Sequence, residues 1–184
     1  MNISPEFSRL VAVMDIPPSG LTMEIEASPE ERARLARRFD LLALDRLRAS
    51  LRLTQAKDLF LLEARFEASL SQACVVTLEP VPAEINVEFS RLYGDDEALA
   101  KIRAVILPEI DIDAEAEDEP DPIEHGRIDV GEAVAEELAL SLEPFPRKPG
   151  ASLENSPWAA KEPGPENSPF AKLSKLQDKL GKKV

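Results

Sequence analysis

Seven arginines near the start of the chain form its largest group of side chains whose chemistry and spacing point to one kind of partner. They occur in two clusters: Arg32, Arg34, Arg37 and Arg38, and then Arg46, Arg48 and Arg52. Guanidinium groups form paired hydrogen bonds with phosphate oxygens, and such contacts position a protein on nucleic acid without reading its sequence. We therefore take these arginines as candidate RNA contacts. The alternative is a solvated, internally paired face, because several carboxylates lie close by in sequence and no aromatic-rich strand is present to stack bases.

The stretch DIDAEAEDEPDPIE, residues 111–124, is dense in carboxylates, which calcium prefers as ligands. It lacks the central glycine and the closing glutamate that an EF-hand loop needs at fixed positions. The only cysteine, Cys74, and the only histidine, His125, do not make a zinc-ligand set. We expect no bound metal and no cofactor.

Signatures of catalysis are missing from the sequence as well. It contains no glycine-rich phosphate loop, no nucleophile elbow and no helical His-Glu pair. Carboxylates are numerous enough to supply a general acid and base, but no pair is distinguished by its spacing. We expect a protein without catalytic residues, and an enzyme with an unrecognised site is the minority hypothesis.

The net charge of −13 is spread unevenly over the 184 residues. Residues 1–107 carry 13 Lys and Arg against 17 Asp and Glu, residues 108–146 carry one Arg against 14 acidic residues, and residues 147–184 carry eight Lys and Arg against four acidic residues. Stretch 111–124 has no apolar periodicity, so we expect a flexible acidic linker there. The sequence has a single cysteine and no signal-peptide pattern, and its longest uncharged run, residues 68–78, is too short for a membrane helix. These features predict a cytoplasmic protein.

The first arginine cluster belongs to an expected helix, and the second to an expected strand. Short apolar runs at 7–13 and 21–27 predict strands on either side of a Pro-Pro-Ser-Gly turn. Ser28, Pro29 and Glu31 then form the pattern of a capping box, which predicts a helix to about Phe39. From Asp45 the period changes to two, which places the second arginine cluster on the open face of a half-buried strand.

Further strands follow with short connections. Apolar residues alternate from Phe60 to Leu70, a short apolar run covers 73–78, and alternation resumes from Ile85 to Phe89. Successive amphipathic strands of this kind predict an antiparallel meander, curled or barrel-like, with helices packed on it. The expected fold class is α+β, with a single domain over residues 1–146 that includes the acidic linker at about 111–124.

A second helix is expected after the acidic linker. Asp129 occupies an N-cap position with Glu132 three residues later, which predicts a capping box. Val130, Val134, Leu138 and Leu142 form an apolar stripe that we expect to pack on the meander. Prolines 144 and 146 are expected to end the helix. Asp129, Glu132 and Glu136 are expected on an exposed face.

The remaining residues, 147–184, form a Pro-rich basic tail in which a short motif occurs twice. ENSPWA at 154–159 is repeated as ENSPFA at 166–171, so each copy presents an aromatic residue, Trp158 or Phe170, after a Ser-Pro pair. We expect short helical turns and two partner contacts on one flexible chain, which raises the effective concentration of a bound partner. The alternative is a tail that binds the chain's own acidic linker or has no partner.

Three segments resemble the YceD family of bacterial proteins. IDVGEAVAEELALSLEPFPR, residues 128–147, is similar to the family's acidic helix with its Asp-apolar-Gly-Glu start. SQACVVTLEPVPAEINVEFSRLY, residues 71–93, and ENSPFAKLSKLQDKL, residues 166–180, match in order and spacing. Asp129, Gly131, Glu132 and Glu136 carry this signature and are candidate partner contacts. Many relatives have a cysteine-rich, zinc-ribbon-like stretch after the proline exit, but RKPGASLENS, residues 147–156, contains no cysteine.

The resemblance implies a role in accumulation or processing of 23S ribosomal RNA and in assembly of the large ribosomal subunit. The preferred hypothesis is a non-enzymatic factor that binds pre-ribosomal RNA or a ribosomal protein. The main alternative is an acidic adaptor or chaperone for a basic partner protein, because 14 acidic residues between 108 and 146 suit a basic protein better than RNA. No membrane partner is expected.

Overall fold

The computed structural model describes residues 5–100 and 120–152. The chain divides into two compact units, Met1–Lys148 and Pro149–Val184. Only residues 149–152 of the second unit are among those described, so the fold below is that of the first unit. None of the described helices is long and apolar enough to span a membrane.

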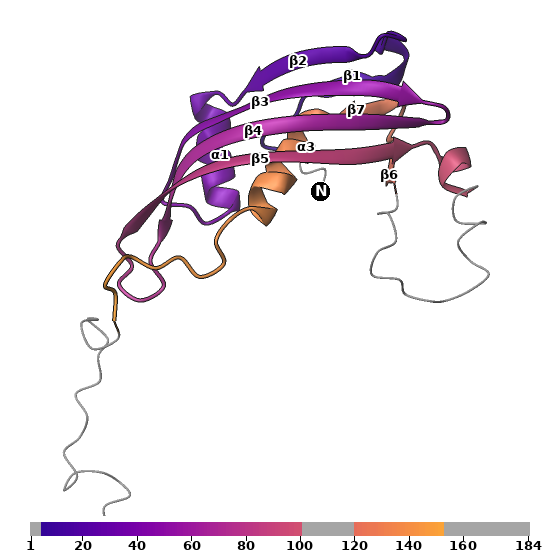
Figure 1. Ribbon diagram of the computed structural model, residues 1–184. Helices are drawn as coiled ribbons and strands as arrows, with labels where there is room; N and C mark the ends of the chain where they lie inside the picture. The colour runs from indigo at the N-terminus through magenta and orange to yellow at the C-terminus, as the bar shows by residue number, and fades with distance from the viewer. Residues whose placement is uncertain (1–4, 101–119, 153–184) are drawn as a thin grey trace, which may run out of the picture. The chain divides into compact units, whose positions relative to one another are not determined.

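The first unit is built on a five-stranded sheet (Figure 1). Its strands, in spatial order, are β2 (Leu21–Glu26), β3 (Ala43–Ala56), β4 (Leu59–Ala73), β5 (Pro80–Gly94) and β6 (Asp121–Pro122). Strands β2 to β5 pair antiparallel, and β6 runs parallel to the end of β5. The expected antiparallel meander is therefore confirmed. The described strands form an open sheet, so the barrel-like detail of the prediction is not confirmed.

The alternation in the sequence correctly identified the buried face of the long strands. Leu47, Ala49, Leu51 and Leu53 of β3 are buried, and in β4 the buried side chains run from Leu62 to Leu70 at every second residue. Both helices lie on this face of the arched sheet (Figure 1). Helix α1 (Pro29–Arg38) packs on β3, and α3 (Val130–Leu140) packs on β4. A short helical stretch at 96–100 precedes residues outside the described part.

A second, two-stranded sheet joins a segment near the N-terminus of the unit to the segment before α3. Strand β1 (Leu10–Ala12), which a short 3₁₀ helix η1 (Val13–Asp15) follows, pairs antiparallel with β7 (Arg127–Asp129). The predicted strand at 7–13 is thus shorter than expected. β7 leads directly into α3, so the pairing places residues 7–12 beside the start of that helix.

Two predicted elements differ from the structure. The run 73–78 is not a strand: Cys74–Glu79 form the connection between β4 and β5, in which the Leu78 amide donates to the Cys74 carbonyl at 2.9 Å. A tight turn is needed here because consecutive strands pair antiparallel, and Leu78 adopts a positive φ of 61°. Helix α3 ends at Leu140, before the prolines expected to stop it, and the Ser141 amide donates to carbonyls of the last turn.

The end of the expected acidic linker contains ordered structure. Asp121 and Pro122 form β6, and the Ile123 amide donates to the Gly94 carbonyl at 2.9 Å. Residues 111–119 lie outside the described part of the chain. His125 and Gly126 then form a two-residue turn in which both have positive φ, 53° and 70°, as a type I′ turn requires. The only histidine thus occupies a turn position that leads into β7.

Candidate functional site

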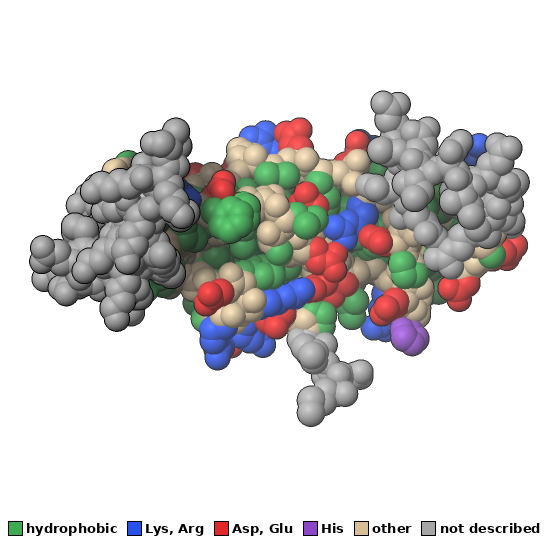
Figure 2. All heavy atoms as spheres, turned by 90° about the horizontal axis from the view of Figure 1, so that it is seen from below, with side chains coloured by type: hydrophobic (Ala, Val, Ile, Leu, Met, Phe, Trp, Pro, Cys, Tyr) green, Lys and Arg blue, Asp and Glu red, His purple; other side chains and the backbone are tan. Residues whose placement is uncertain are grey.

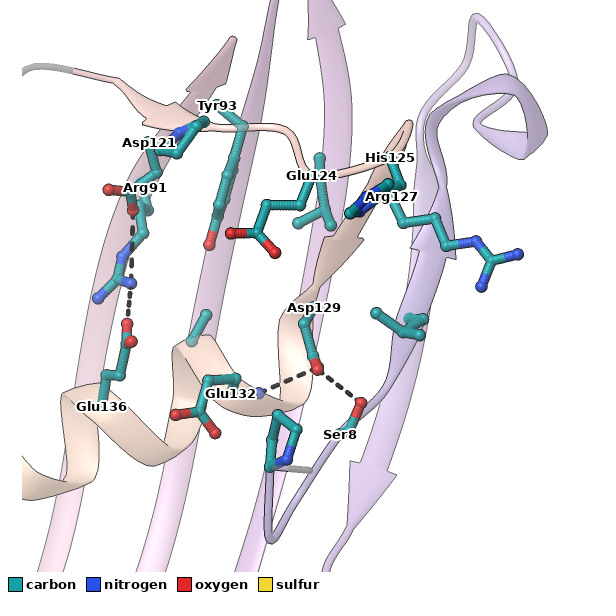
Figure 3. Close-up of a pocket in the computed structure, with 15 residues that line it drawn as sticks. Ser8, Arg91, Tyr93, Asp121, Glu124, His125, Arg127, Asp129, Glu132 and Glu136 are labelled. Carbon is teal, nitrogen blue, oxygen red and sulfur yellow. Dashed lines mark hydrogen bonds and ion pairs between the residues drawn. The ribbon is translucent and has the colours of Figure 1, made fainter. Parts of the chain in front are cut away.

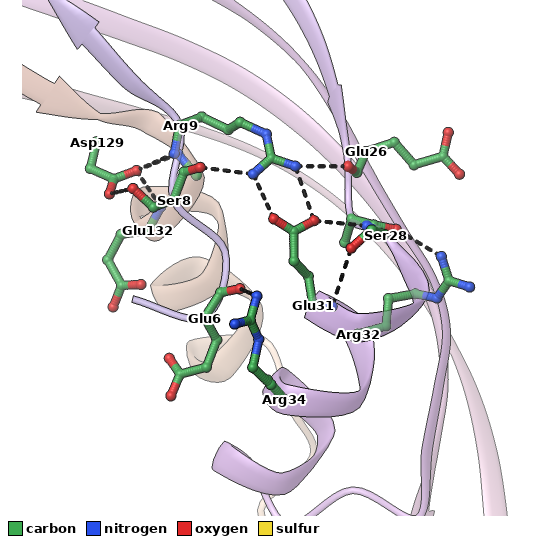
Figure 4. Close-up of polar contacts among 12 residues, drawn as sticks. Glu6, Ser8, Arg9, Glu26, Ser28, Glu31, Arg32, Arg34, Asp129 and Glu132 are labelled. Atoms are coloured by element: carbon green, nitrogen blue, oxygen red, sulfur yellow. Dashed lines mark hydrogen bonds and ion pairs between the residues drawn. The ribbon is translucent and has the colours of Figure 1, made fainter. Parts of the chain in front are cut away.

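The Asp129 carboxylate is the centre of a hydrogen-bond network that ties α3 to the N-terminal segment (Figure 4). It caps α3 by accepting from the amides of Gly131 and Glu132, both at 3.1 Å. It also accepts from the Arg9 amide at 2.7 Å and from the Ser8 hydroxyl. Asp129 is therefore not a free carboxylate on an exposed face, as we expected, but a part-buried one with four donors.

Gly131 allows the N-terminal segment to approach the helix closely. A Cβ atom at this position would lie 2.5 Å from the Phe7 carbonyl oxygen and 2.8 Å from the Arg9 nitrogen. Both are backbone atoms, so the clash would not be relieved by a side-chain rotation. This close contact accounts for the glycine of the signature.

Glu132 does not complete the predicted capping box. Instead of bonding back to the N-cap amide, its carboxylate pairs with both terminal nitrogens of Arg38, at 2.7 and 3.1 Å. Arg38 also donates to the Glu6 carboxylate at 2.9 Å. The two carboxylates raise the pKa of Arg38, and Glu132 contributes most. Arg38 therefore links α1, α3 and the N-terminal segment and is largely engaged within the fold.

Arg9 makes a matching link to the start of α1. Its guanidinium binds both oxygens of Glu31, at 2.7 and 3.0 Å, and donates to the Glu26 carbonyl. Glu31 and Ser28 form the predicted capping box, which is confirmed. The hydrogen bond from Arg9, with help from the Ser28 amide, lowers the pKa of Glu31 from 4.5 to about 2. The arrangement fixes the N-terminal segment between the starts of two helices.

A cleft of about 690 Å³ lies beside this network, between the start of α3 and the ends of β5, β6 and β7 (Figure 3). Arg91 reaches across it to Glu136 and lies 3.5 Å from Asp121. Tyr93 lines the same cleft, and burial raises its pKa to about 12. The other ionisable lining residues are Glu124, His125, Arg127, Asp129 and Glu132. Five carboxylates against two arginines leave an acidic excess in this cleft, although Glu132 pairs with Arg38 and Glu136 with Arg91.

The β3 arginines lie on the outer face of the sheet, away from the helices. Arg46 and Arg48 both bind the Glu67 carboxylate, at 3.0 and 2.8 Å, and Arg52 donates to the Ser19 carbonyl. The register places four arginines and six glutamates on the outer face of β2 to β5: Arg46, Arg48, Arg52 and Arg65, with Glu24, Glu26, Glu63, Glu67, Glu84 and Glu88. This face is a mixture of both signs with an acidic excess.

The α1 arginines form a separate group. Arg32, Arg34 and Arg37 donate to the carbonyls of Ala27, Glu6 and Ala33, respectively, and in the described chain none of the three pairs with a carboxylate. Arg34 and Arg37 are exposed. The sheet separates this group from the β3 arginines, so the seven candidates do not form one surface. The other candidates, Trp158 and Phe170, lie outside the described residues.

Cys74 occupies a buried corner where the β4–β5 connection meets the segment after α3. Its sulfur accepts from the Lys148 amide at 3.4 Å, and this hydrogen bond, with others from Thr77, lowers the pKa of the thiol to about 6. The Val75 amide donates to the Pro146 carbonyl, and Lys148 pairs with Glu79 at 2.9 Å. Within the described ranges, no cluster of His, Cys, Asp and Glu could hold a metal ion.

Sequence reasoning missed the residues that complete these networks. Ser8 and Arg9 were not identified, because nothing local relates them to a helix 120 residues later. Glu6 and Arg91 were also missed. Arg91 interrupts the alternation of β5 with a charge on its inner face, where Tyr93 follows it. A charged residue at an inner-face position of β5 was the sequence signal that could have predicted the cleft.

Comparison with known families agrees with the signature. The family sequence model described as large ribosomal RNA subunit accumulation protein YceD matches residues 62–177, more than half of the chain. No curated protein and no solved structure matches the chain. The matched region contains most of β4, the whole of β5, β6, β7 and α3, and the whole of the Asp129 signature. The chain belongs to the YceD family.

Proposed function

We propose that this protein supports accumulation of 23S ribosomal RNA in the cytoplasm as a non-enzymatic factor in assembly of the large ribosomal subunit. The family match over residues 62–177 carries this proposal, because the family is described by large ribosomal RNA accumulation. The protein acts by binding pre-ribosomal RNA or a ribosomal protein.

The role of the signature residues supports a binding function over catalysis. Asp129, Gly131 and Glu132 hold the N-terminal segment and two helices together, through a cap, a close backbone contact and an ion pair. In the cleft, Arg91 and Glu136 are paired with each other. These groups are engaged with partners inside the fold, and the roles that the structure gives them are structural.

Helix α1 offers the best surface for RNA. Arg34 and Arg37 are exposed, and their guanidinium groups donate to backbone carbonyls, which leaves other N–H donors for phosphate oxygens. Arg46 and Arg48 share Glu67, so phosphate contacts there would have to displace an existing pair. RNA contact by this protein is therefore expected through α1.

An adaptor or chaperone for a basic protein is the second candidate. It is favoured by the acidic excess on the outer sheet face and by the cleft with five carboxylates against two arginines. Local fields of this sign attract basic proteins and repel RNA.

A binding experiment separates the two modes. The full chain is titrated with a 23S rRNA fragment and with purified basic large-subunit proteins over a salt series. Under the RNA mode, the double variant Arg34→Gln, Arg37→Gln loses RNA affinity and shows a weaker salt dependence, whereas Arg48→Gln, whose side chain is already paired, changes little. Retained protein binding without RNA binding at any salt supports the adaptor.

Depletion in cells tests the proposal as a whole. Loss of the protein should lower the amount of 23S rRNA and of large subunits relative to small subunits. Unchanged 23S rRNA and unchanged subunit profiles after depletion would contradict the proposed function, whichever binding mode the purified protein shows.

A further inference from the structure

Strand β5 leaves a long edge of the main sheet without a strand partner among the described residues. The Gly94 carbonyl accepts from Ile123 of the β6 segment, so Gly94 directs its backbone groups away from β4. The β4–β5 register is regular, and backbone direction alternates along a strand. The backbone groups of every second residue therefore face the open edge: Glu84, Asn86, Glu88, Ser90 and Leu92.

The start of this edge is closed by prolines. Pro80 and Pro82 occupy the same alternate positions, where a ladder hydrogen bond to β4 is not needed. They have no N–H to offer a new strand. The available edge is thus the stretch from Glu84 to Leu92, bounded by prolines at one end and by β6 at the other.

The two faces beside this edge differ in chemistry. On the inner face, Ala83, Ile85, Val87 and Phe89 are only partly buried, whereas the inner-face residues of β4 from Leu62 to Leu70 are buried. Figure 2 shows apolar side chains gathered on this helix-bearing side of the sheet, with charged side chains around them. On the outer face, the exposed side chains along the same edge include Glu84, which accepts from the Ser69 hydroxyl at 2.7 Å, and Glu88, which pairs with Arg65 at 3.4 Å. An added strand would meet apolar residues below and carboxylates above.

We infer that the β5 edge binds an extended segment of a basic protein as an added strand. Backbone hydrogen bonds to Asn86, Glu88 and Ser90 would supply the pairing. Alternate apolar side chains of the segment would cover the inner face of β5, and Lys or Arg side chains at the intervening positions would lie opposite Glu84 and Glu88. The inference rests on the proposed function in one respect: the proposed function identifies the protein that supplies this segment as a basic protein of the large subunit.

A second copy of the chain fits this edge poorly. In an antiparallel pair of two β5 edges centred on Asn86, Glu84 of each copy would lie opposite Glu88 of the other, and in a pair centred on Val87 these glutamates would be diagonal neighbours. Like charges directly opposite each other destabilise a strand pair. The same glutamates repel the phosphates of RNA. The charge of the edge thus selects a basic strand over both.

The test uses the full chain and a fluorescent synthetic peptide that alternates Arg with Val. A control peptide replaces each Arg with Glu. Asn86→Pro removes the edge-facing N–H without removing a bond to β4, and Asn86→Ala is the matched control, because both variants lose the Arg65–Asn86 side-chain bond of 3.1 Å. We expect the Arg peptide to bind wild type and Asn86→Ala alike and Asn86→Pro about tenfold more weakly. The Glu peptide should bind none of them.

Charge reversal gives an independent readout. The double variant Glu84→Lys, Glu88→Lys should no longer bind the Arg peptide and should bind the Glu peptide. In wild type bound to the Arg peptide, hydrogen exchange should slow at the backbone amides of Asn86, Glu88 and Ser90. Equal affinity of Asn86→Pro and Asn86→Ala, or protection only outside β5, would overturn the inference. The inference would also be overturned if a 23S rRNA fragment protected these amides from exchange and the Arg peptide did not bind. Because these assays use purified protein, their failure leaves the depletion test of the proposed function unaffected.

Discussion

The backbone amide of Arg9 and the carboxylate of Asp129 lie 2.7 Å apart, although 120 positions separate them in the sequence. Through this contact the first described segment of the chain is joined to the helix that carries the family signature. Asp129 thereby combines a local role, as the N-cap of α3, with a long-range one. The stability of the fold should depend on it strongly.

Asp129→Ala should lower the free energy of unfolding by about 2–3 kcal/mol, because it removes a helix cap and leaves the Arg9 amide without its acceptor. Urea denaturation followed by circular dichroism measures this change. Glu24→Ala, on the exposed outer face of β2, is the control and should stay within about 0.5 kcal/mol of wild type. An Asp129→Ala variant as stable as Glu24→Ala would show that the network contributes little.

Gly131→Ala should also destabilise the protein, although alanine is the better helix former. The added Cβ would lie 2.5 Å from the Phe7 carbonyl oxygen, so the N-terminal segment would have to move at a cost of about 2 kcal/mol or more. Ala139→Gly in the same helix is the comparison variant, because it should lower the free energy of unfolding by about 1 kcal/mol through helix propensity alone. Thermal and urea unfolding should show that Gly131→Ala is less stable than Ala139→Gly. The reverse order of stability would contradict the close contact between Gly131 and the N-terminal segment.

The Arg9–Glu31 pair should produce a specific pH dependence of stability. The pKa of Glu31 is about 2 in the folded protein and 4.5 without its partners, so ionisation favours the folded state. This contribution is complete above about pH 4.5 and is lost as the pH falls through 2. Relative to Glu31→Gln, wild type should gain at most about 3 kcal/mol across this window. Arg9→Gln should reduce the gain, and a gain that persists without Arg9 would refute the assigned cause.

The Cys74 thiol should titrate near pH 6, with the Lys148 amide as the main cause. Ultraviolet absorbance of the thiolate, with Cys74→Ser as the blank, measures the titration. Lys148→Pro removes the donating N–H and should shift the midpoint towards the ordinary value of 9. Lys148→Ala keeps the N–H, although it loses the pair with Glu79, and should titrate close to wild type. Equal midpoints for the two variants would exclude the amide as the cause.

Local patterns predicted the elements of this fold well. The alternation in β3 and β4 identified the buried face, and the Ser28–Glu31 capping box marked the start of α1, because both signals arise from neighbours within a few residues. The fold class could be predicted for the same reason. The connection at 74–79 was misread because its apolar residues resemble a strand, whereas the pairing of the flanking strands forces a turn.

The candidate site was less accessible to sequence reasoning, since its contacts join distant segments. Glu132 has the spacing of a capping-box residue, but Arg38 competes successfully for its carboxylate. The arginines look alike in sequence, yet Arg38 is held between two carboxylates, while Arg34 and Arg37 are exposed and have none. Only the fold distinguishes a structural arginine from one available to a partner.

The pairing of β1 with β7 also determines the order in which a growing chain can fold. Strands β2 to β5 are neighbours in sequence and can pair as each leaves the ribosome, whereas β1 has no partner strand until residues 127–129 have been synthesised. Until then the apolar Phe7 and Val11, both buried in the finished protein, are left without their final contacts. Synthesis of the Asp129 signature is thus the event that closes the domain, and a chain terminated before it would expose its own N-terminal segment to proteases and chaperones.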